Sequence, residues 1–291
     1  MNILYKYNAF TRNALKEKYT YRFKAIMWAL SSVFNMLVQY YLWKSIYSEV
    51  NGTFFGVSQA SYLMYIGFGV VCYSMTSCME NMTIAEDIKS GNISMNLIKP
   101  FNYKYMVLFR HIGSKLGEII GLVPVIIIVC LLLRGSEFDI VRILLFIISL
   151  VLAFGVSFLF SYIMGLVTFW TTNYWGLQFF TGTLMGLFSG QLMAINFYID
   201  IGKGTQVFNS TLSFLNAPVF TEFFRVLGIL AYCLPFQSMY YTPMSILSGI
   251  IDSSDQIIIH LLLQVWWLVC LSVIAELLWK CGQKKITILG G

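Results

Sequence analysis

The chain has little charge, which excludes a soluble globular protein. Only 11% of its 291 residues are Asp, Glu, Lys or Arg, against about 25% in an ordinary soluble domain, while 58% are apolar. The mean hydropathy of +0.74 indicates a chain that lies largely in lipid. This length could hold roughly six helices of about 20 residues, which leaves no room for a soluble catalytic domain.

Motifs for nucleotide binding and for metal or covalent catalysis are also missing. The sequence contains no GxxxxGK[ST], HExxH or GxSxG, and no GxGxxG between a strand and a helix. The six cysteines form no CxxC pair, and His111 and His260 have no acidic or cysteine neighbour at ligand spacing. We therefore expect no catalytic residue, cofactor or metal in this chain, and the net charge of +6 does not imply a nucleic-acid partner.

Gaps between the charged residues predict an all-α polytopic membrane protein with six transmembrane helices. The predicted spans cover residues 25–46, 59–79, 113–133, 143–170, 175–197 and 256–279. The 57 residues from Ile143 to Ile199 carry no charge and are too many for one helix, so we divide them at residues 171–173. The third span is the least distinct, because its apolar run from Ile119 to Leu133 has 15 residues.

The distribution of basic residues predicts the orientation. With both ends in the cytoplasm, inner segments hold fourteen Lys and Arg and outer segments hold five. Residues 1–24 form an amphipathic interfacial segment with no apolar core, so we expect no cleavable signal peptide. Residues 25–279 form the membrane domain, and residues 280–291 form a basic cytoplasmic tail.

A short amphipathic helix is predicted on the cytoplasmic side, between the second and third spans. Thr83 and Glu86 have the spacing of a capping box, and Gly91 is a natural stop. Ile84, Ala85 and Ile88 form one apolar side of a helix over about residues 83–90. Such a helix could lie on lipid headgroups, but acidic Glu86 and Asp87 favour docking on a protein, because anionic leaflets attract basic helices.

Three segments carry a resemblance to a known family. They are the N-terminal segment ending in Tyr21-Arg22-Phe23, the block from Asp87 to Ile93 followed by Leu97-Ile98-Lys99-Pro100, and the tail from Lys284-Lys285-Ile286 to Gly290-Gly291. The central block is similar to a D-I-x-x-G-x-I…L-x-R/K-P pattern, with Lys99 where arginine is usual. In their order these features resemble the permease subunit of bacterial ATP-binding-cassette transporters of the type-2 exporter superfamily.

The resemblance implies a function and partners. Residues Glu86 to Asn92 would belong to a coupling helix that sits in a groove of a separate ATPase subunit, with Thr83, Ile84, Asp87, Ile88, Lys89 and Gly91 as its further candidate residues. Two separate ATPase subunits would bind ATP and Mg. A second copy of this chain, or a homologous permease, would complete the transporter in the bacterial cytoplasmic membrane. The cargo would be hydrophobic or amphipathic, such as a drug, an antimicrobial peptide or a lipid-like molecule.

Residues 201–255 are expected on the outer side as re-entrant helices. Their apolar pieces, such as the nine residues from Val226 to Leu234, are too short to cross a membrane. The resemblance makes them a cap over the transport pathway. Because prolines fix bends, Pro218 and Pro235 are the candidate residues of an outer gate.

Polar residues in the spans leave an alternative open. Lys115 with Glu118, and Glu276 with Lys280, have the spacing of intramembrane ion pairs near the inner face. A membrane-embedded enzyme would need convergent polar groups deep in a span, and His260 and Gln264 are the candidates. A secondary transporter without an ATPase would favour inverted repeats, which the sequence does not display.

Overall fold

The computed structural model describes residues 3–20, 22–49, 53–133, 139–171, 174–203 and 218–289. Within these ranges the chain is all-α apart from a short hairpin of β1 (Thr53–Phe54) and β2 (Val57–Ser58). The helices are α1 (Ile3–Thr20), α2 (Arg22–Glu49), α3 (Gln59–Thr76), α4 (Glu80–Lys89), α5 (Asn92–Ile98), α6 (Tyr103–Leu132), α7 (Ile140–Val167), α8 (Tyr174–Phe188), α9 (Ile195–Gly202), α10 (Pro218–Cys233), the 3-10 helix η2 (Pro235–Met239), α11 (Tyr241–Ser248) and α12 (Ser254–Leu289).

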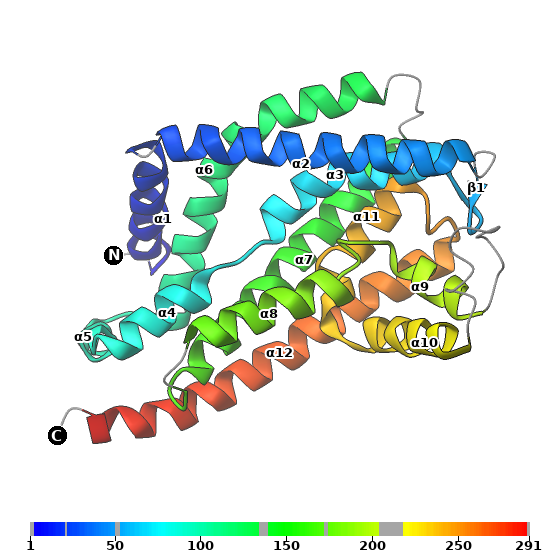
Figure 1. The fold of residues 1–291 in the computed structure, drawn as a ribbon. Helices are drawn as coiled ribbons and strands as arrows, with labels where there is room; N and C mark the ends of the chain where they lie inside the picture. Colours follow the sequence, from blue (N-terminus) through cyan, green and yellow to red (C-terminus); the bar gives the residue numbers. More distant parts are fainter. Residues whose placement is uncertain are drawn as a thin grey trace.

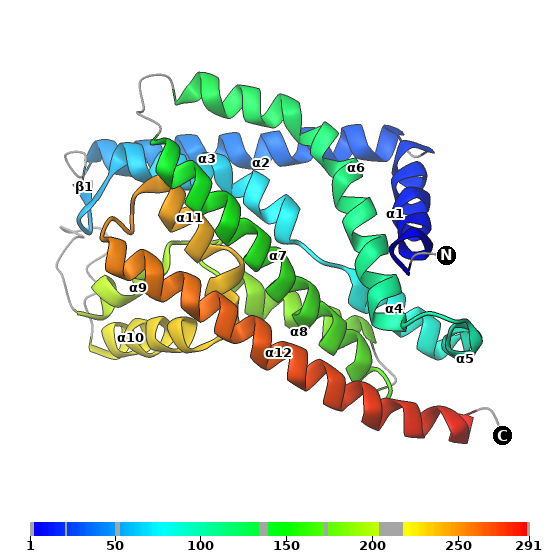
Figure 2. The same cartoon turned by 180° about the vertical axis from the view of Figure 1, so that it is seen from behind.

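The molecule has two distinct ends, joined by its long helices. One end carries α1, the α4–α5 hairpin, the N-terminus and the C-terminal end of α12 (Figure 1). The opposite end carries the β-hairpin, α9 and α10, and the view from behind shows the same division (Figure 2). The two ends of the chain therefore lie on the same side of the helix bundle.

Three described segments are long and apolar enough to cross a membrane. They are residues 59–89, 140–167 and 254–285, and α6 is a fourth if its two bent halves form one span. The α2 helix has 28 residues, but its Ser, Asn, Gln and Tyr residues lower its hydropathy. The α8 helix has 15 residues, which is short for a span. The chain is thus a multi-helix membrane protein, and the layout of six spans stays a prediction.

The α6 helix bends by 50° between its halves at residues 119 and 121. Pro124 lies inside the helix, and it has no N–H to donate to the carbonyl four residues earlier, at residue 120. The missing hydrogen bond falls at the bend. The third predicted span, 113–133, therefore runs across a kink and is not a straight helix.

One predicted helix was wrong. The span expected as one helix over 175–197 is divided, because α8 ends at Phe188 and α9 begins at Ile195. Gly190 lies in this break with φ of +85°, a conformation that glycine adopts without strain. The α12 helix continues without a break to Leu289, so the described part of the predicted tail from residue 280 is helical; its place in the cytoplasm stays a prediction, and residues 290–291 lie outside the described part.

The chain between α9 and α12 enters the helix bundle and returns. Residues 204–217 of the predicted re-entrant segment lie outside the described ranges. From the far end α10 leads inward to η2, and every residue from Pro235 to Ser248 is buried. The Tyr241 N–H donates to the Ser189 carbonyl at 2.9 Å, so the turn is held against the break that follows α8.

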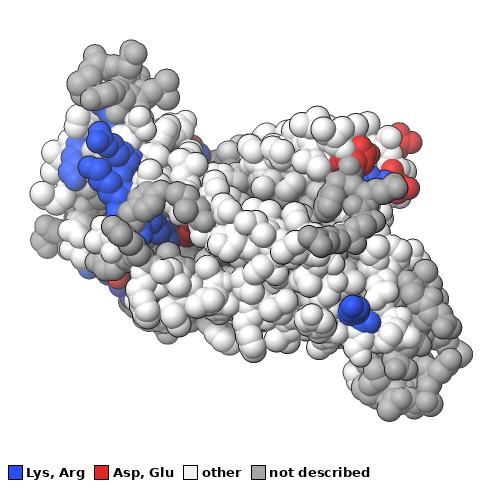
Figure 3. All heavy atoms as spheres, turned by 90° about the horizontal axis from the view of Figure 1, so that it is seen from above, with Lys and Arg blue, Asp and Glu red and all other residues white. Residues whose placement is uncertain are grey.

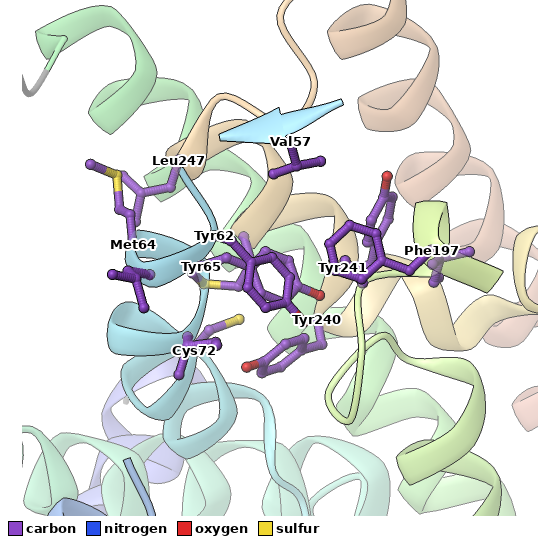
Figure 4. Close-up of a cluster of buried hydrophobic side chains, with 14 of the residues drawn as sticks. Val57, Tyr62, Met64, Tyr65, Cys72, Phe197, Tyr240, Tyr241 and Leu247 are labelled. Atoms are coloured by element: carbon purple, nitrogen blue, oxygen red, sulfur yellow. The ribbon is translucent and has the colours of Figure 1, made fainter. Parts of the chain in front are cut away.

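Two clusters of buried side chains form the core. The first is rich in tyrosine and joins α2, α3, α9 and α11, with Tyr62, Tyr65, Tyr240 and Tyr241 at its centre (Figure 4). The second joins α4, α6, α7 and α12 around Ile84, Tyr162 and Leu166. The second cluster positions the helix predicted to couple to a partner.

Candidate functional site

The α4 helix begins earlier than the sequence pattern predicts. It starts at Glu80 with Met79 as N-cap, and no side chain caps it, so the capping box of Thr83 and Glu86 was wrong. Thr83 lies within the helix instead. Gly91 follows the helix with φ of +75°, and the Gly91 N–H donates to the Ile88 carbonyl at 3.3 Å.

The apolar side of α4 is buried in protein. Ile84 and Ala85 are fully buried, and Ile88 is nearly so, against the second core cluster. At Gly165 of α7 an added Cβ would lie 2.8 to 3.0 Å from three side-chain atoms of Ile84, so the two helices meet at close range. The apolar side is therefore unavailable to lipid headgroups, which removes the alternative of a helix lying on the membrane surface.

The two acidic residues of α4 have different environments. Glu86 is exposed, whereas the Asp87 carboxylate accepts a hydrogen bond from the Tyr103 hydroxyl at 2.7 Å. Lys89 lies with its ammonium 4.5 Å from the centre of the Tyr174 ring, and it joins the hairpin to the start of α8. Glu86 is thus the acid of this pair that α4 presents to solvent.

The α5 helix adds a surface that the sequence reasoning missed. It lies at the tip of the hairpin (Figure 1), and Met95 and Ile98 are 64% and 82% exposed. Ile93 alone among the residues of α5 is buried. The heptapeptide is too short for its periodicity to reveal an exposed apolar side, so no sequence signal could have identified it.

A buried polar cluster lies at the break between α3 and α4. The Glu80 carboxylate accepts from Arg110 Nη2 at 3.0 Å, and its other oxygen lies 3.3 Å from His111 Nδ1. The Cys78 sulfur lies 3.9 Å from the same nitrogen. Across the described residues no group of three or more His, Cys, Asp or Glu could hold a metal ion. The cluster anchors the start of α4 to α6.

One of the two predicted ion pairs forms within a larger network. Lys115 Nζ lies 2.9 Å from Glu118 Oε2 and also donates to the Ser74 carbonyl and to Ser77 Oγ. Lys18 of α1 approaches the other Glu118 oxygen at 2.6 Å. The network ties α1, α3 and α6 together.

The second predicted pair is not brought together. Glu276 and Lys280 are both described and exposed on α12, and no ion pair joins them.

The α1 helix packs along α6, where the Thr11 hydroxyl donates to the Phe109 carbonyl at 2.9 Å. One side of the N-terminal segment is therefore covered by protein.

The two gate candidates lie at opposite ends of α10. Pro218 is exposed at its first residue, whereas Pro235 begins η2 and is buried. The next residue, Phe236, packs edge to face on Phe160 of α7 with ring centres 5.0 Å apart. Pro235 thus lies at the deep end of the re-entrant segment and not over the outer surface.

The candidates for a membrane-embedded enzyme do not form a site. Gln264 is fully buried, and its amide bonds to the Ser149 hydroxyl and to the carbonyls of Ser149 and Ser238. His260 Nδ1 lies 2.9 Å from the Gln256 carbonyl of its own helix. The two side chains bond to different partners and not to each other, so the geometry gives no support to intramembrane catalysis at these positions.

A small cleft of about 90 Å³ lies between the end of α3, α4, α7 and α8, beside the polar cluster at the break between α3 and α4. The side chains of Asn81 on α4 and Gln178 on α8 are hydrogen-bonded to each other at this cleft. Its lining residues are Tyr73, Ser77, Cys78, Met79, Asn81, Ser157, Phe160, Ser161, Met164, Gln178, Thr181, Gly182, Met185 and Gln191. None of these side chains is ionised, and about half can form hydrogen bonds.

On one face of the molecule, most of the basic residues and most of the acidic residues lie at opposite ends (Figure 3). Figure 3 shows Lys and Arg gathered at the end that carries α1, while Asp and Glu gather at the other end of the same face. An excess of basic residues on one side of a membrane protein marks its cytoplasmic side. The hairpin of α4 and α5 lies at the basic end (Figure 1).

Comparison with known proteins identifies the class. A family model described as ABC-2 family transporter protein matches residues 33–194, which is more than half of the chain. The chain belongs to this family, which supports a transmembrane permease of an ABC transporter and implies an ABC ATPase as its partner. No curated protein and no solved structure matches it. The matched region extends from α2 to the break before α9 and includes the α4–α5 hairpin and the cleft.

Proposed function

We propose that this permease is the membrane subunit of an ATP-driven exporter that moves a hydrophobic or amphipathic molecule out of a bacterial cell. The observation that carries the proposal is the hairpin of α4 and α5, which is anchored on α7 through Ile84 and Gly165 and presents Glu86 and exposed apolar residues at the basic end. A helix fixed in this way can transmit a movement of a docked partner into the bundle.

The partner is an ATPase, which binds ATP and Mg in its own chain. Two ATPase subunits and a second permease, either a copy of this chain or a homologue, complete the transporter. The exposed apolar residues of α5 suit a docking contact, since an exposed apolar cluster rimmed by polar residues is typical of a protein interface.

The membrane topology that we propose has both termini in the cytoplasm. Chain ends on the same side of the bundle require an even number of crossings, which is compatible with the six spans that we propose, in which α8 and α9 form a broken fifth span (Figures 1 and 2). The α9 and α10 helices then lie on the outer side. The bend at Pro235 lets the chain return outward. We therefore assign exposed Pro218 to the rim of the outer gate and buried Pro235 to its base.

Substitution Glu86→Lys tests the docking site. The change places a positive charge where the partner meets an acid, and we expect about tenfold weaker association with the ATPase subunit in a pull-down from detergent. Glu17→Lys is the control, because Glu17 is exposed on α1 at the same end and the charge change is identical. Unchanged association and fully coupled ATP hydrolysis in Glu86→Lys would place the docking site elsewhere.

A further inference from the structure

The cleft between α4, α7 and α8 contains hydrogen-bonding atoms that the protein leaves unused. Asn81 Oδ1 and Ser157 Oγ are buried and have no hydrogen-bond partner, and their residues are 7% and 2% exposed. Both residues line the cleft. A buried polar atom without a hydrogen-bond partner is unfavourable. Asn81 Oδ1 accepts hydrogen bonds and Ser157 Oγ can donate or accept one, so the pair suits a molecule with a hydroxyl or amide group.

Lys115, which contacts the lining residue Ser77, and Glu80, which lies between the lining residues Met79 and Asn81, already have partners. Lys115 donates to Ser74, Ser77 and Glu118, and the Glu80 carboxylate is engaged by Arg110 and His111. None of the lining side chains offers an ionic partner. A charged head group would lose its hydration here without compensation, so the cleft favours an uncharged one.

The rest of the lining is apolar and adaptable. Met79, Met164 and Met185 surround the polar atoms together with the Phe160 ring. Methionine side chains are flexible and polarisable and so adjust to molecules of different shape. At about 90 Å³ the cleft has room for part of a head group, and the apolar remainder of such a molecule must lie outside it.

The cleft is also connected to the hairpin. The hydrogen bond between Asn81 and Gln178 joins α4 to α8, and a shallower cleft lined by Asn81, Met82, Met164, Thr168, Tyr174 and Leu177 adjoins the first. A molecule that bonds to Asn81 therefore contacts the helix that we assign to the ATPase. Occupancy of the cleft and the position of α4 would be linked.

We propose that this cleft binds an uncharged amphiphile through a hydroxyl- or amide-bearing head group, held by Asn81 and Ser157. The inference rests on the proposed function, since it names the chemical class of the cargo. Ser157 Oγ has no internal partner, so Ser157→Ala removes a ligand contact without breaking a hydrogen bond of the protein.

The test is a labelling experiment on the full-length permease in lipid nanodiscs, without ATPase. An added Cβ meets nothing within 4 Å at Gly182 or at Gly186, and Gly182 lines the cleft while Gly186 does not. Gly182→Cys and Gly186→Cys are alkylated with N-ethylmaleimide, and the rate at each cysteine is followed by peptide mass spectrometry. The probes are decyl glucoside, decyltrimethylammonium and decyl sulfate, which share a chain and differ in head-group charge.

Decyl glucoside should slow labelling at residue 182 about threefold or more, and the two charged probes should slow it much less. Residue 186 should be unaffected, and Ser157→Ala should largely abolish the protection at 182. As a second readout, decyl glucoside should raise the unfolding temperature of the unaltered chain more than that of Ser157→Ala.

Equal protection by all three probes, equal protection at residue 186, or no protection at 182 would overturn the assignment. Because no ATPase is present, such a failure leaves the docking of the partner on α4 and α5 intact. Conversely, protection at residue 182 combined with normal ATPase association in Glu86→Lys would overturn the docking proposal and leave the cleft in place.

Discussion

At the scale of single residues, buried polar side chains hold together helices that apolar packing alone would leave free to slide. Gln264 of α12 accepts from Ser149 Oγ at 3.0 Å and donates to the Ser238 carbonyl at 2.8 Å, so one amide joins α12, α7 and η2. We infer that this side chain fixes the depth at which the re-entrant segment turns.

Gln264→Leu should therefore destabilise the protein. The change keeps the volume of the side chain but leaves the Ser149 hydroxyl and the Ser238 carbonyl without a partner, at a cost of about 1–3 kcal/mol. Thermal unfolding in detergent should show a lower midpoint, while Gln256→Leu, at an exposed position of the same helix, should leave it nearly unchanged. Equal midpoints for the two variants would refute the role assigned to Gln264.

Individual site residues were predicted from sequence with mixed success, for a physical reason. Helical periodicity identified Ile84, Ala85 and Ile88 as one side, and that side is buried. Periodicity cannot tell which of two adjacent acids has a partner, and Asp87 is bound by Tyr103 from another helix. Asn81 and Ser157 meet in the cleft from α4 and α7, a relation that no spacing along the chain encodes.

At the scale of elements, α4 and α7 meet at close range where Ile84 packs on Gly165. Gly165 allows it, because a side chain there would meet the branched, stiff side chain of Ile84. The α4 helix can follow or drive α7 only while this contact holds.

Gly165→Ala should loosen that link. The added methyl group must displace Ile84 or separate the helices, which costs about 1–3 kcal/mol as overpacking. We expect a lower unfolding midpoint and ATP hydrolysis that is less dependent on cargo. Gly186→Ala is the matched control, since its Cβ enters open space and the residue does not line the cleft. A Gly165→Ala protein as stable and as well coupled as the control would show that α4 and α7 are not rigidly joined.

The sequence predicted long elements better than interrupted ones. Charge-free runs located α3, α7 and α12 to within a few residues at their N-terminal ends, because a membrane-length apolar run has few alternatives to a helix. The division of the fifth span at residues 189–194 was missed, since those residues are as uncharged as their neighbours. That break depends on the re-entrant segment, whose Tyr241 N–H binds the Ser189 carbonyl.

At the scale of the whole molecule, charge and geometry both support the orientation that we propose. The basic end carries α1, the hairpin and both ends of the described chain, and the opposite end carries the β-hairpin, α9 and α10 (Figures 1 and 3). A polytopic chain with its ends on one side crosses the membrane an even number of times. Under the orientation that we propose, the basic end is the cytoplasmic side.

This orientation predicts the accessibility of single cysteines in a background in which the native cysteines are replaced. Ser253, just before α12, and Ser90, after α4, are both exposed and lie at opposite ends of the molecule. In intact cells an impermeant thiol reagent should label Ser253→Cys and spare Ser90→Cys, and opening the cells should make Ser90→Cys reactive. The second step is the control, because it separates a cysteine on the inner side from one that is merely buried. Labelling of Ser90→Cys from outside would invert the orientation and would remove the hairpin of α4 and α5 from reach of any cytoplasmic ATPase.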